Sequence, residues 1–227
     1  MALLAAWLGG SISKARGVVG RSLMGQPRLD VTVFMDYVCP FCYVGAVRLE
    51  RLRDTYDLRV HWALVELHPE TPAQGRLLAA LGYPPEQWRR MMRHLEAMAE
   101  TEGLSFVPRE KTVNSRCALL LAEAAKEADR EVFYALHWRL FEAYFAEGRD
   151  IGDETVLREL ARTAGVPQAT VSAAWREPRY ARRLARNLAI AGAWGVSGTP
   201  TYLFNRRKLA GAVPTETLRE AAAEIAE

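Results

Sequence analysis

The chain has 227 residues, half of them hydrophobic and a quarter charged, and this composition excludes an intrinsically disordered protein. The formal net charge is only +3, and the basic residues are interspersed with acidic ones instead of forming a basic stripe. Both features argue against nucleic acid as a partner. Three cysteines are too few for a disulfide-stapled scaffold, and no apolar run reaches the ~18–20 residues of a membrane span. We therefore expect a cytoplasmic protein without a membrane span, whose cysteines have a chemical role.

Residues 1–28 are predicted to form an N-terminal extension outside the fold. Residues 1–29 contain no acidic residue, and four basic ones: Lys14, Arg16, Arg21 and Arg28. The positive charge follows the short apolar stretch, whereas a secretory signal has its positive charge before that stretch. An acid-free segment with arginines is also typical of an organelle transit peptide. A plain extension with the true start at Met24, organelle targeting and export all stay open.

The fold is predicted to begin with a strand, a helix and a second strand. Residues 29–35 form an alternating run that is rich in β-branched side chains, and this pattern predicts a strand. Residues 58–67 predict a second strand. Between them, apolar residues recur every three to five positions and predict a helix: Phe41, Val44, Val47, Leu52 and Tyr56. A strand, helix and strand in this order form a βαβ unit, so we expect the two strands to be parallel.

From residue 74 to 194 the apolar periodicity is helical almost throughout. Helix starts are predicted at Asn114 or Ser115 and at Asp153, and helix ends at Gly103 and Gly165. Sheet character returns in residues 201–205 and 208–211, which predict a hairpin, and Pro214 opens a last helix. The sequence thus predicts one α/β domain, made of residues 29–73 and 195–227, with residues 74–194 inserted as a helical domain.

Cys39 and Cys42 are separated by two residues, Pro40 and Phe41, at the turn between the first strand and the first helix. Cys39 would sit at the helix N-terminus, where free N–H groups and the helix dipole stabilise a thiolate. A free thiol has a pKa near ~8.5, and such sites lower it to roughly 3.5–7. One helical turn on, Cys42 can attack a mixed disulfide formed at Cys39 and release the product. The spacing therefore indicates a redox-active pair.

Two other interpretations of the cysteine pair are a zinc site and a pair of inert buried cysteines. A zinc site needs two further ligands at comparable spacing, but the four histidines are scattered along the chain, so no metal site is predicted. Inert buried cysteines are also open, although a proline and an aromatic residue between them at a strand-to-helix turn fit that role poorly.

A second element of interest is Pro200, which precedes the predicted hairpin after a glycine-containing turn. A cis bond at Pro200 would turn the Thr199 backbone toward Cys39. Only about 5–6% of X–Pro bonds in folded proteins are cis. The local sequence alone therefore favours a trans proline that starts a strand.

Several segments together resemble the DsbA family of thioredoxin-fold oxidoreductases, in particular its FrnE-like subgroup. The matching segments are VTVFMDYVCPFCYVG, ELHPETP, EAYFAEGRDIGDETVLRELA and GVSGTPTYLF, and the resemblance covers about residues 30–226. It implies a thioredoxin fold with a large helical insertion, and disulfide exchange through Cys39 and Cys42. It also implies that Pro200 is cis, that Thr199 tunes the redox site, and that Thr199, Pro200 and Phe41 contact the substrate.

The resemblance implies protein or low-molecular-weight disulfides as substrates and no bound cofactor. Glutathione or a thioredoxin-type protein would be the reductant, and glutathione could also be a cosubstrate. The same branch includes kappa-class glutathione transferases and 2-hydroxychromene-2-carboxylate isomerases, which typically have serine at the position of Cys39. A glutathione-dependent isomerase or transferase is therefore the alternative enzyme, and a redox-inert binding module is the alternative outside catalysis.

The third cysteine and a stripe of methionines are predicted to have structural roles. Cys117 occurs at an apolar helical spacing, which favours core packing over a resolving or regulatory thiol. A methionine stripe at Met91, Met92 and Met98 favours core packing over a peptide-docking face.

Overall fold

The structure is a computed structural model that describes residues 25–226. The predictions for residues 1–24, including Met24 as a start and any targeting role, lie outside the described residues. In the described range, no helix combines the length and the apolar character needed to cross a membrane.

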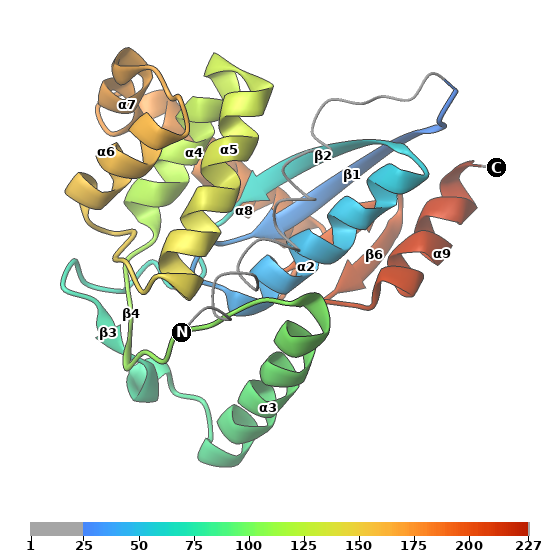
Figure 1. The fold of residues 1–227 in the computed structure, drawn as a ribbon, viewed down its shortest axis with the longest axis horizontal. Coiled ribbons are helices and arrows are strands. Elements are labelled where there is room, and N and C mark those ends of the chain that lie inside the picture. The colour runs from blue at the N-terminus through green and yellow to red at the C-terminus, as the bar shows by residue number, and fades with distance from the viewer. Residues whose placement is uncertain (1–24, 227) are drawn as a thin grey trace, which may run out of the picture.

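A four-stranded sheet in the order β2-β1-β5-β6 forms the centre of the molecule (Figure 1). Strand β1 (Arg28–Met35) pairs in parallel with β2 (Asp57–Leu64), which confirms the predicted βαβ unit. On its other side β1 pairs antiparallel with β5 (Thr201–Phe204), and β5 pairs antiparallel with β6 (Arg207–Ala210). The fold is the predicted α/β thioredoxin type, in which strands before and after the long helical segment share one sheet.

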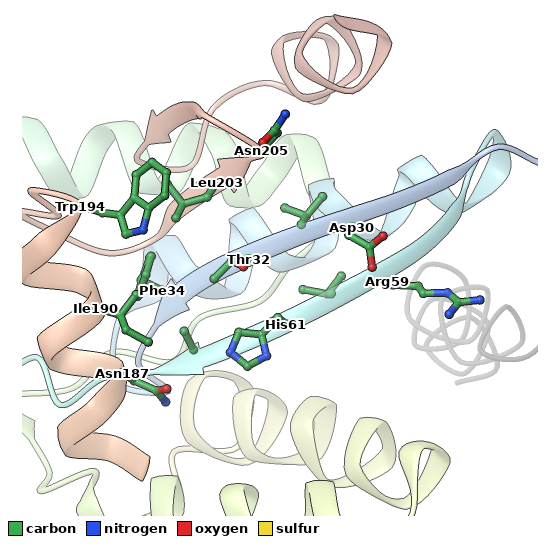
Figure 2. Close-up of a pocket in the computed structure, with 13 residues that line it drawn as sticks. Asp30, Thr32, Phe34, Arg59, His61, Asn187, Ile190, Trp194, Leu203 and Asn205 are labelled. Atoms are coloured by element: carbon green, nitrogen blue, oxygen red, sulfur yellow. The ribbon is translucent and has the colours of Figure 1, made fainter. Parts of the chain in front are cut away.

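The two faces of the sheet are covered unequally. Helices α2 (Pro40–Glu50) and α9 (Thr215–Ala226) cover one face, where Val31, Val33 and Met35 of β1 enter the main core. On the other face, α8 (Pro178–Ala193) packs Ala191 over a small cluster that includes Phe34. The rest of that face lines an open hollow of about 490 Å³, with Trp194 at one end and Asp30 and Arg59 at the other (Figure 2).

The segment between β2 and β5 is almost entirely helical, as predicted. Its helices are α3 (Pro85–Glu102), α4 (Arg116–Ala128), α5 (Arg130–Phe141), α6 (Glu154–Thr163), α7 (Gln168–Ala174) and α8. A two-stranded ribbon, β3 (Arg76–Leu77) with β4 (Lys111–Thr112), was not predicted, because two residues are too few for a recognisable alternation. This ribbon flanks α3 in the chain, and α3 projects from the body of the molecule (Figure 1). Whether residues 74–194 form a separate domain stays a prediction.

The predicted helix ends agree with the structure. Asp153 accepts a hydrogen bond from Thr155 N at 2.6 Å and caps α6. Gly103 ends α3 with φ of 68°, a left-handed conformation that glycine adopts without steric cost. Ser115 occupies the N-cap of α4, but its hydroxyl donates to Asp36 rather than capping the helix.

The second strand ends at Leu64, three residues earlier than predicted. The amide of Leu67 donates to the carboxylate of Asp36 at 2.8 Å and is therefore not available to a strand partner. The strand ends where its partner β1 ends, with Met35 opposite Leu64, and the hydrogen bond to Asp36 keeps Leu67 outside the ladder, although the apolar pattern of the sequence continues to Leu67.

A buried ion pair attaches α3 to α2. The Arg48 guanidinium donates to Glu102 Oε1 at 2.7 Å and to the Ala212 carbonyl at 2.7 Å. Both side chains are nearly inaccessible, with 9% and 2% of their area exposed. Truncating one partner of a buried pair is costly, because the other charge stays buried without its partner. Arg48 therefore holds α2, α3 and the loop before α9 in one arrangement.

Helix α2 approaches β5 most closely at Gly45. A Cβ atom at this position would overlap the hydroxyl oxygen of Tyr202 and lie 3.0 Å from Pro200 Cγ and 3.3 Å from Tyr202 Cζ. Tyr202 is fully buried, and its hydroxyl has no hydrogen-bond partner in the described part of the chain. Glycine is therefore needed at position 45 chiefly because of one oxygen atom, with Pro200 Cγ as a second close neighbour.

This packing predicts non-additive stability changes. We expect Gly45→Ala to cost about 1–3 kcal/mol, the usual range for overpacking, less the helix propensity that alanine adds. Tyr202→Phe should cost little, because it removes an unsatisfied hydroxyl. In the double variant the overlap with the hydroxyl is gone and the closest remaining contacts are Pro200 Cγ at 3.0 Å and Cζ at 3.3 Å, so much of the Gly45→Ala cost should disappear. Urea unfolding of the four proteins measures the coupling, and additive costs would contradict the packing.

Candidate functional site

Cys39 and Cys42 lie at the junction of β1 and α2. Cys39 is the N-cap residue of α2, with extended backbone (φ −88°, ψ 111°), and Pro40 starts the helix. The Cys39 amide donates to the Asp36 carbonyl at 3.2 Å, and the Cys42 amide donates to the Cys39 carbonyl at 3.0 Å. Both cysteines are free thiols, and only 4% and 2% of their surfaces are exposed.

The segment before β5 closes over the cysteine pair. The Cys39 thiol donates to the carbonyl oxygen of Thr199 at 3.4 Å, although the two residues are 160 positions apart in the chain. The Thr199–Pro200 peptide bond is cis, as the resemblance implied and contrary to the preference from local sequence alone. Pro200 is buried, and its carbonyl accepts from the Gly211 amide at 2.8 Å, which ties the loop to the end of β6.

The two thiols differ in acidity. Burial raises the pKa of Cys39, but the polar groups of Cys42 and Thr199 beside it offset this, so the pKa lies below that of an ordinary thiol. Burial raises the pKa of Cys42 well above its ordinary value, and its hydrogen bond to Cys39 and the Cys39 charge raise it further. The N-terminal thiol of the pair is therefore the one that ionises first.

Thr199 can accommodate both protonation states of Cys39. Its carbonyl accepts from the protonated thiol, as described above. Its hydroxyl is buried, has no hydrogen-bond partner in the described residues, and lies close enough to lower the pKa of both cysteines. A hydroxyl can donate to a thiolate, whereas a carbonyl cannot. The same residue thus offers an acceptor to the thiol and a donor to the thiolate.

The structure brings Cys39, Cys42, Thr199 and Pro200 together at one end of the sheet. Phe41 is the remaining residue expected at the site, and it lies between the two cysteines in the sequence. Its side chain is half-buried and packs against the main core. Its contact with a substrate stays a prediction.

Asp36 is a site residue that the sequence analysis missed. It is fully buried, and its carboxylate accepts from Leu67 N at 2.8 Å, Ser115 Oγ at 2.9 Å and Val38 N at 3.3 Å. Burial raises its pKa to about 6, even though these three hydrogen bonds act in the opposite direction. A negative charge on Asp36 in turn raises the pKa of Cys39. A single acidic residue in the otherwise apolar run before Cys39 was the available signal.

Other candidates lie outside this site. Cys117 is half-buried, burial raises its pKa, and its carbonyl accepts from the Trp175 indole. In the methionine stripe, Met98 is buried and Met91 and Met92 are half-buried. His137 is buried against Tyr37, and burial lowers its pKa to about 3, so it stays neutral. Residues 25–226 contain no group of three or more metal-ligating side chains.

The open hollow is not part of the cysteine site. It lies on the sheet face opposite α2, and its lining contains neither cysteine (Figure 2). Its side chains come from β1, β2, β5 and the end of α8, with Phe34 and Ile190 at the apolar end.

The raised pKa of Asp36 predicts a pH-dependent stability. The group binds its proton more tightly when folded (pKa about 6) than when unfolded (pKa ~3.9), so its stabilising effect is complete below ~4 and is lost as the pH rises through 6. Asp36→Asn removes this titration. We expect the unfolding free energy of the wild type, minus that of the variant, to fall by about 2–3 kcal/mol between pH 4 and 7. Urea unfolding across this range measures it, and a constant difference would refute the assignment.

Several known proteins are similar to this chain over most of its length. The uncharacterized protein YwbO of Bacillus subtilis (strain 168) is 28% identical over 197 residues, which cover 85% of this chain and 95% of YwbO. Among solved structures, the probable DsbA oxidoreductase SCO1869 from Streptomyces coelicolor has a TM-score of 0.76 at 27% identity, and the match covers 87% of this chain and 90% of that one.

A third similar protein has been solved with a bound thiol. The cytosolic disulfide reductase DsbM from Pseudomonas aeruginosa with GSH has a TM-score of 0.63 at 20% identity, and the match covers 87% of this chain and 97% of DsbM. The model of the DSBA-like thioredoxin domain matches residues 30–223, which include both cysteines and Thr199–Pro200. The chain therefore belongs to the DSBA-like thioredoxin domain family.

Proposed function

We propose that this protein is a thiol–disulfide oxidoreductase whose reactive groups are Cys39 and Cys42. The observation that supports this most is the difference in acidity within the pair: an acidic thiol caps a helix against Thr199, and a less acidic thiol follows one turn later. This order suits a nucleophile followed by a resolving thiol.

The exchange runs in two balanced steps. The Cys39 thiol loses its proton to solvent, and the thiolate attacks a substrate disulfide. A bond forms between Cys39 and one substrate sulfur, and the other substrate sulfur leaves as a thiolate and takes up a proton. Cys42 then attacks the Cys39 sulfur, so that the Cys39–Cys42 disulfide forms and the second substrate thiolate leaves with the proton lost by Cys42. The substrate is reduced to two thiols and the protein is oxidised; the reverse sequence oxidises a dithiol.

The docking edge in this proposal consists of Thr199 and Pro200, with Phe41 beside the cysteines. A disulfide in an extended segment would reach Cys39 next to the Thr199 carbonyl. Protein disulfides and low-molecular-weight disulfides both fit this edge. Glutathione is the small thiol that we propose as reductant, and the structure of the cytosolic reductase DsbM with GSH supports both this choice and a cytoplasmic location.

The difference in acidity between the two cysteines predicts which thiol reacts first. The exposed fractions of 4% and 2% do not separate Cys39 from Cys42, so their acidity decides. At pH 6 we expect a limiting amount of iodoacetamide to modify Cys39 first, since the thiolate is the reactive form. Cys117 is more exposed but less acidic, and should react only at higher pH. Peptide mapping by mass spectrometry measures the order, and faster labelling of Cys42 would reverse the proposed roles.

Cysteine variants and thiol titration separate the proposed function from its alternatives. Cys42→Ser should accumulate substrate covalently bound to Cys39, because the resolving thiol is absent. Cys39→Ser is the matched control and should trap nothing. Titration of free thiols with Ellman's reagent, after glutathione disulfide and again after dithiothreitol, should show two thiols lost and regained in the wild type. A glutathione-dependent isomerase or transferase would need no such disulfide, and a redox-inert binding module would form none.

A further inference from the structure

The Tyr202 hydroxyl is buried without a partner next to the redox pair. Other buried tyrosines donate or accept through their hydroxyl groups: Tyr37 with His137, Tyr134 with Arg53, Tyr144 with Thr112 and Tyr180 with Glu127. The Tyr202 hydroxyl makes no hydrogen bond within the described residues. Phenylalanine would fill the same space without burying an unsatisfied group, so the hydroxyl costs folding stability.

The oxygen lies against the turn of α2 that contains Cys42. It occupies the place of a Cβ atom at Gly45, which is three residues after Cys42 and therefore on the same side of the helix. The Cα–Cβ direction in a helix tilts toward the N-terminus, so this place lies on the Cys42 side of Gly45. Pro200 touches the same place, since its Cγ would be 3.0 Å from that Cβ.

The chemistry of the hydroxyl suits a hydrogen-bond donor. Burial raises the pKa of Tyr202 well above its ordinary value, and negative charge on Cys42 and then on Cys39 raises it further. The phenol therefore keeps its proton at neutral pH while a sulfur nearby becomes negative. Arg48 acts on Tyr202 in the opposite direction but is occupied by Glu102 and the Ala212 carbonyl.

We propose that Tyr202 is a positioning residue for the resolving step, and that its hydroxyl stabilises the negative charge that develops on the Cys42 sulfur. The inference rests on the proposed function and assigns a donor to its second step. Cys42 loses its proton to the leaving substrate thiolate as its sulfur bonds to Cys39, and its charge is transient. In the reverse direction a thiolate attacks Cys39, and Cys42 leaves with the same charge.

This role predicts an effect on rates without an effect on the equilibrium. Neither the dithiol with a protonated Cys42 nor the disulfide has a charge on that sulfur. The hydroxyl therefore lowers the barrier in both directions by the same amount. Tyr202→Phe should slow both directions equally and leave the equilibrium with the glutathione pair unchanged.

The test uses the reduced wild-type protein, glutathione disulfide and rapid acid quenching followed by mass spectrometry. A first phase, proportional to the concentration of glutathione disulfide, forms the adduct on Cys39, and a second, concentration-independent phase converts it to the Cys39–Cys42 disulfide. In Tyr202→Phe we expect the second phase to slow by about tenfold, the size of a lost hydrogen bond to a charged group, while the first changes less than twofold.

Two further variants control for structure. Tyr144→Phe removes a buried hydroxyl of the helical segment and should change neither phase. The double variant Gly45→Ala, Tyr202→Phe fills the vacated space with a methyl group and should stay slow, because packing is restored but the donor is not. An unchanged second phase in Tyr202→Phe, recovery in the double variant, or an equal slowing of both phases would overturn the inference. A wild type that forms no Cys39–Cys42 disulfide would instead overturn the proposed function.

Discussion

Strand β1 pairs with β2 on one side and with β5 on the other, and the geometry of the site depends on this central position. Because β1 and β5 are antiparallel, with Phe34 opposite Thr201, the chain that leaves β1 and the chain that enters β5 meet at the same end of the sheet. The first of these contains Cys39 and the second contains Thr199. A hydrogen bond between residues 160 positions apart is thus a consequence of strand register.

The buried surroundings of the cysteines make each nearby polar group important. A thiol taken out of water becomes less acidic unless donors replace the lost solvation. At Cys39 the polar groups of Cys42 and Thr199 do so, whereas at Cys42 the nearby groups do not, and the pair becomes asymmetric. Asp36 acts against this asymmetry when it is ionised, because its charge raises the pKa of Cys39. The acidity of the reactive thiol is therefore a balance among groups from two separate parts of the chain, the segment around Cys39 and the segment before β5.

The helical segment is attached to this centre by buried polar contacts as well as by apolar packing. Ser115, at the start of α4, donates to Asp36 three residues before Cys39. Glu102, near the end of α3, accepts from Arg48 on the helix that Cys39 caps. Both contacts fall on the strand–turn–helix unit of the cysteines. A rearrangement of the helical segment would therefore act directly on the residues that hold the thiols in place.

The sequence by itself determined the elements whose causes are local. The alternation of residues 29–35, the cap at Asp153 and the stop at Gly103 depend on neighbouring residues, and the structure agrees with each. The place of Cys39 at a helix start followed in the same way from a strand followed by helical periodicity. The family resemblance added the cis bond at Pro200, which local statistics had disfavoured.

Only the tertiary structure decided the features that depend on residues far apart in the chain. The end of β2 at Leu64 depends on the end of β1 at Met35, and the glycine at position 45 on a tyrosine of β5. The pKa of Asp36 depends on burial, as does the lack of a hydrogen-bond partner within residues 25–226 for the Thr199 and Tyr202 hydroxyls, and no single segment encodes burial. Hydrogen-bond satisfaction and desolvation are properties of the packed chain, so the polar groups around the cysteines could not be assigned until the strands were placed side by side.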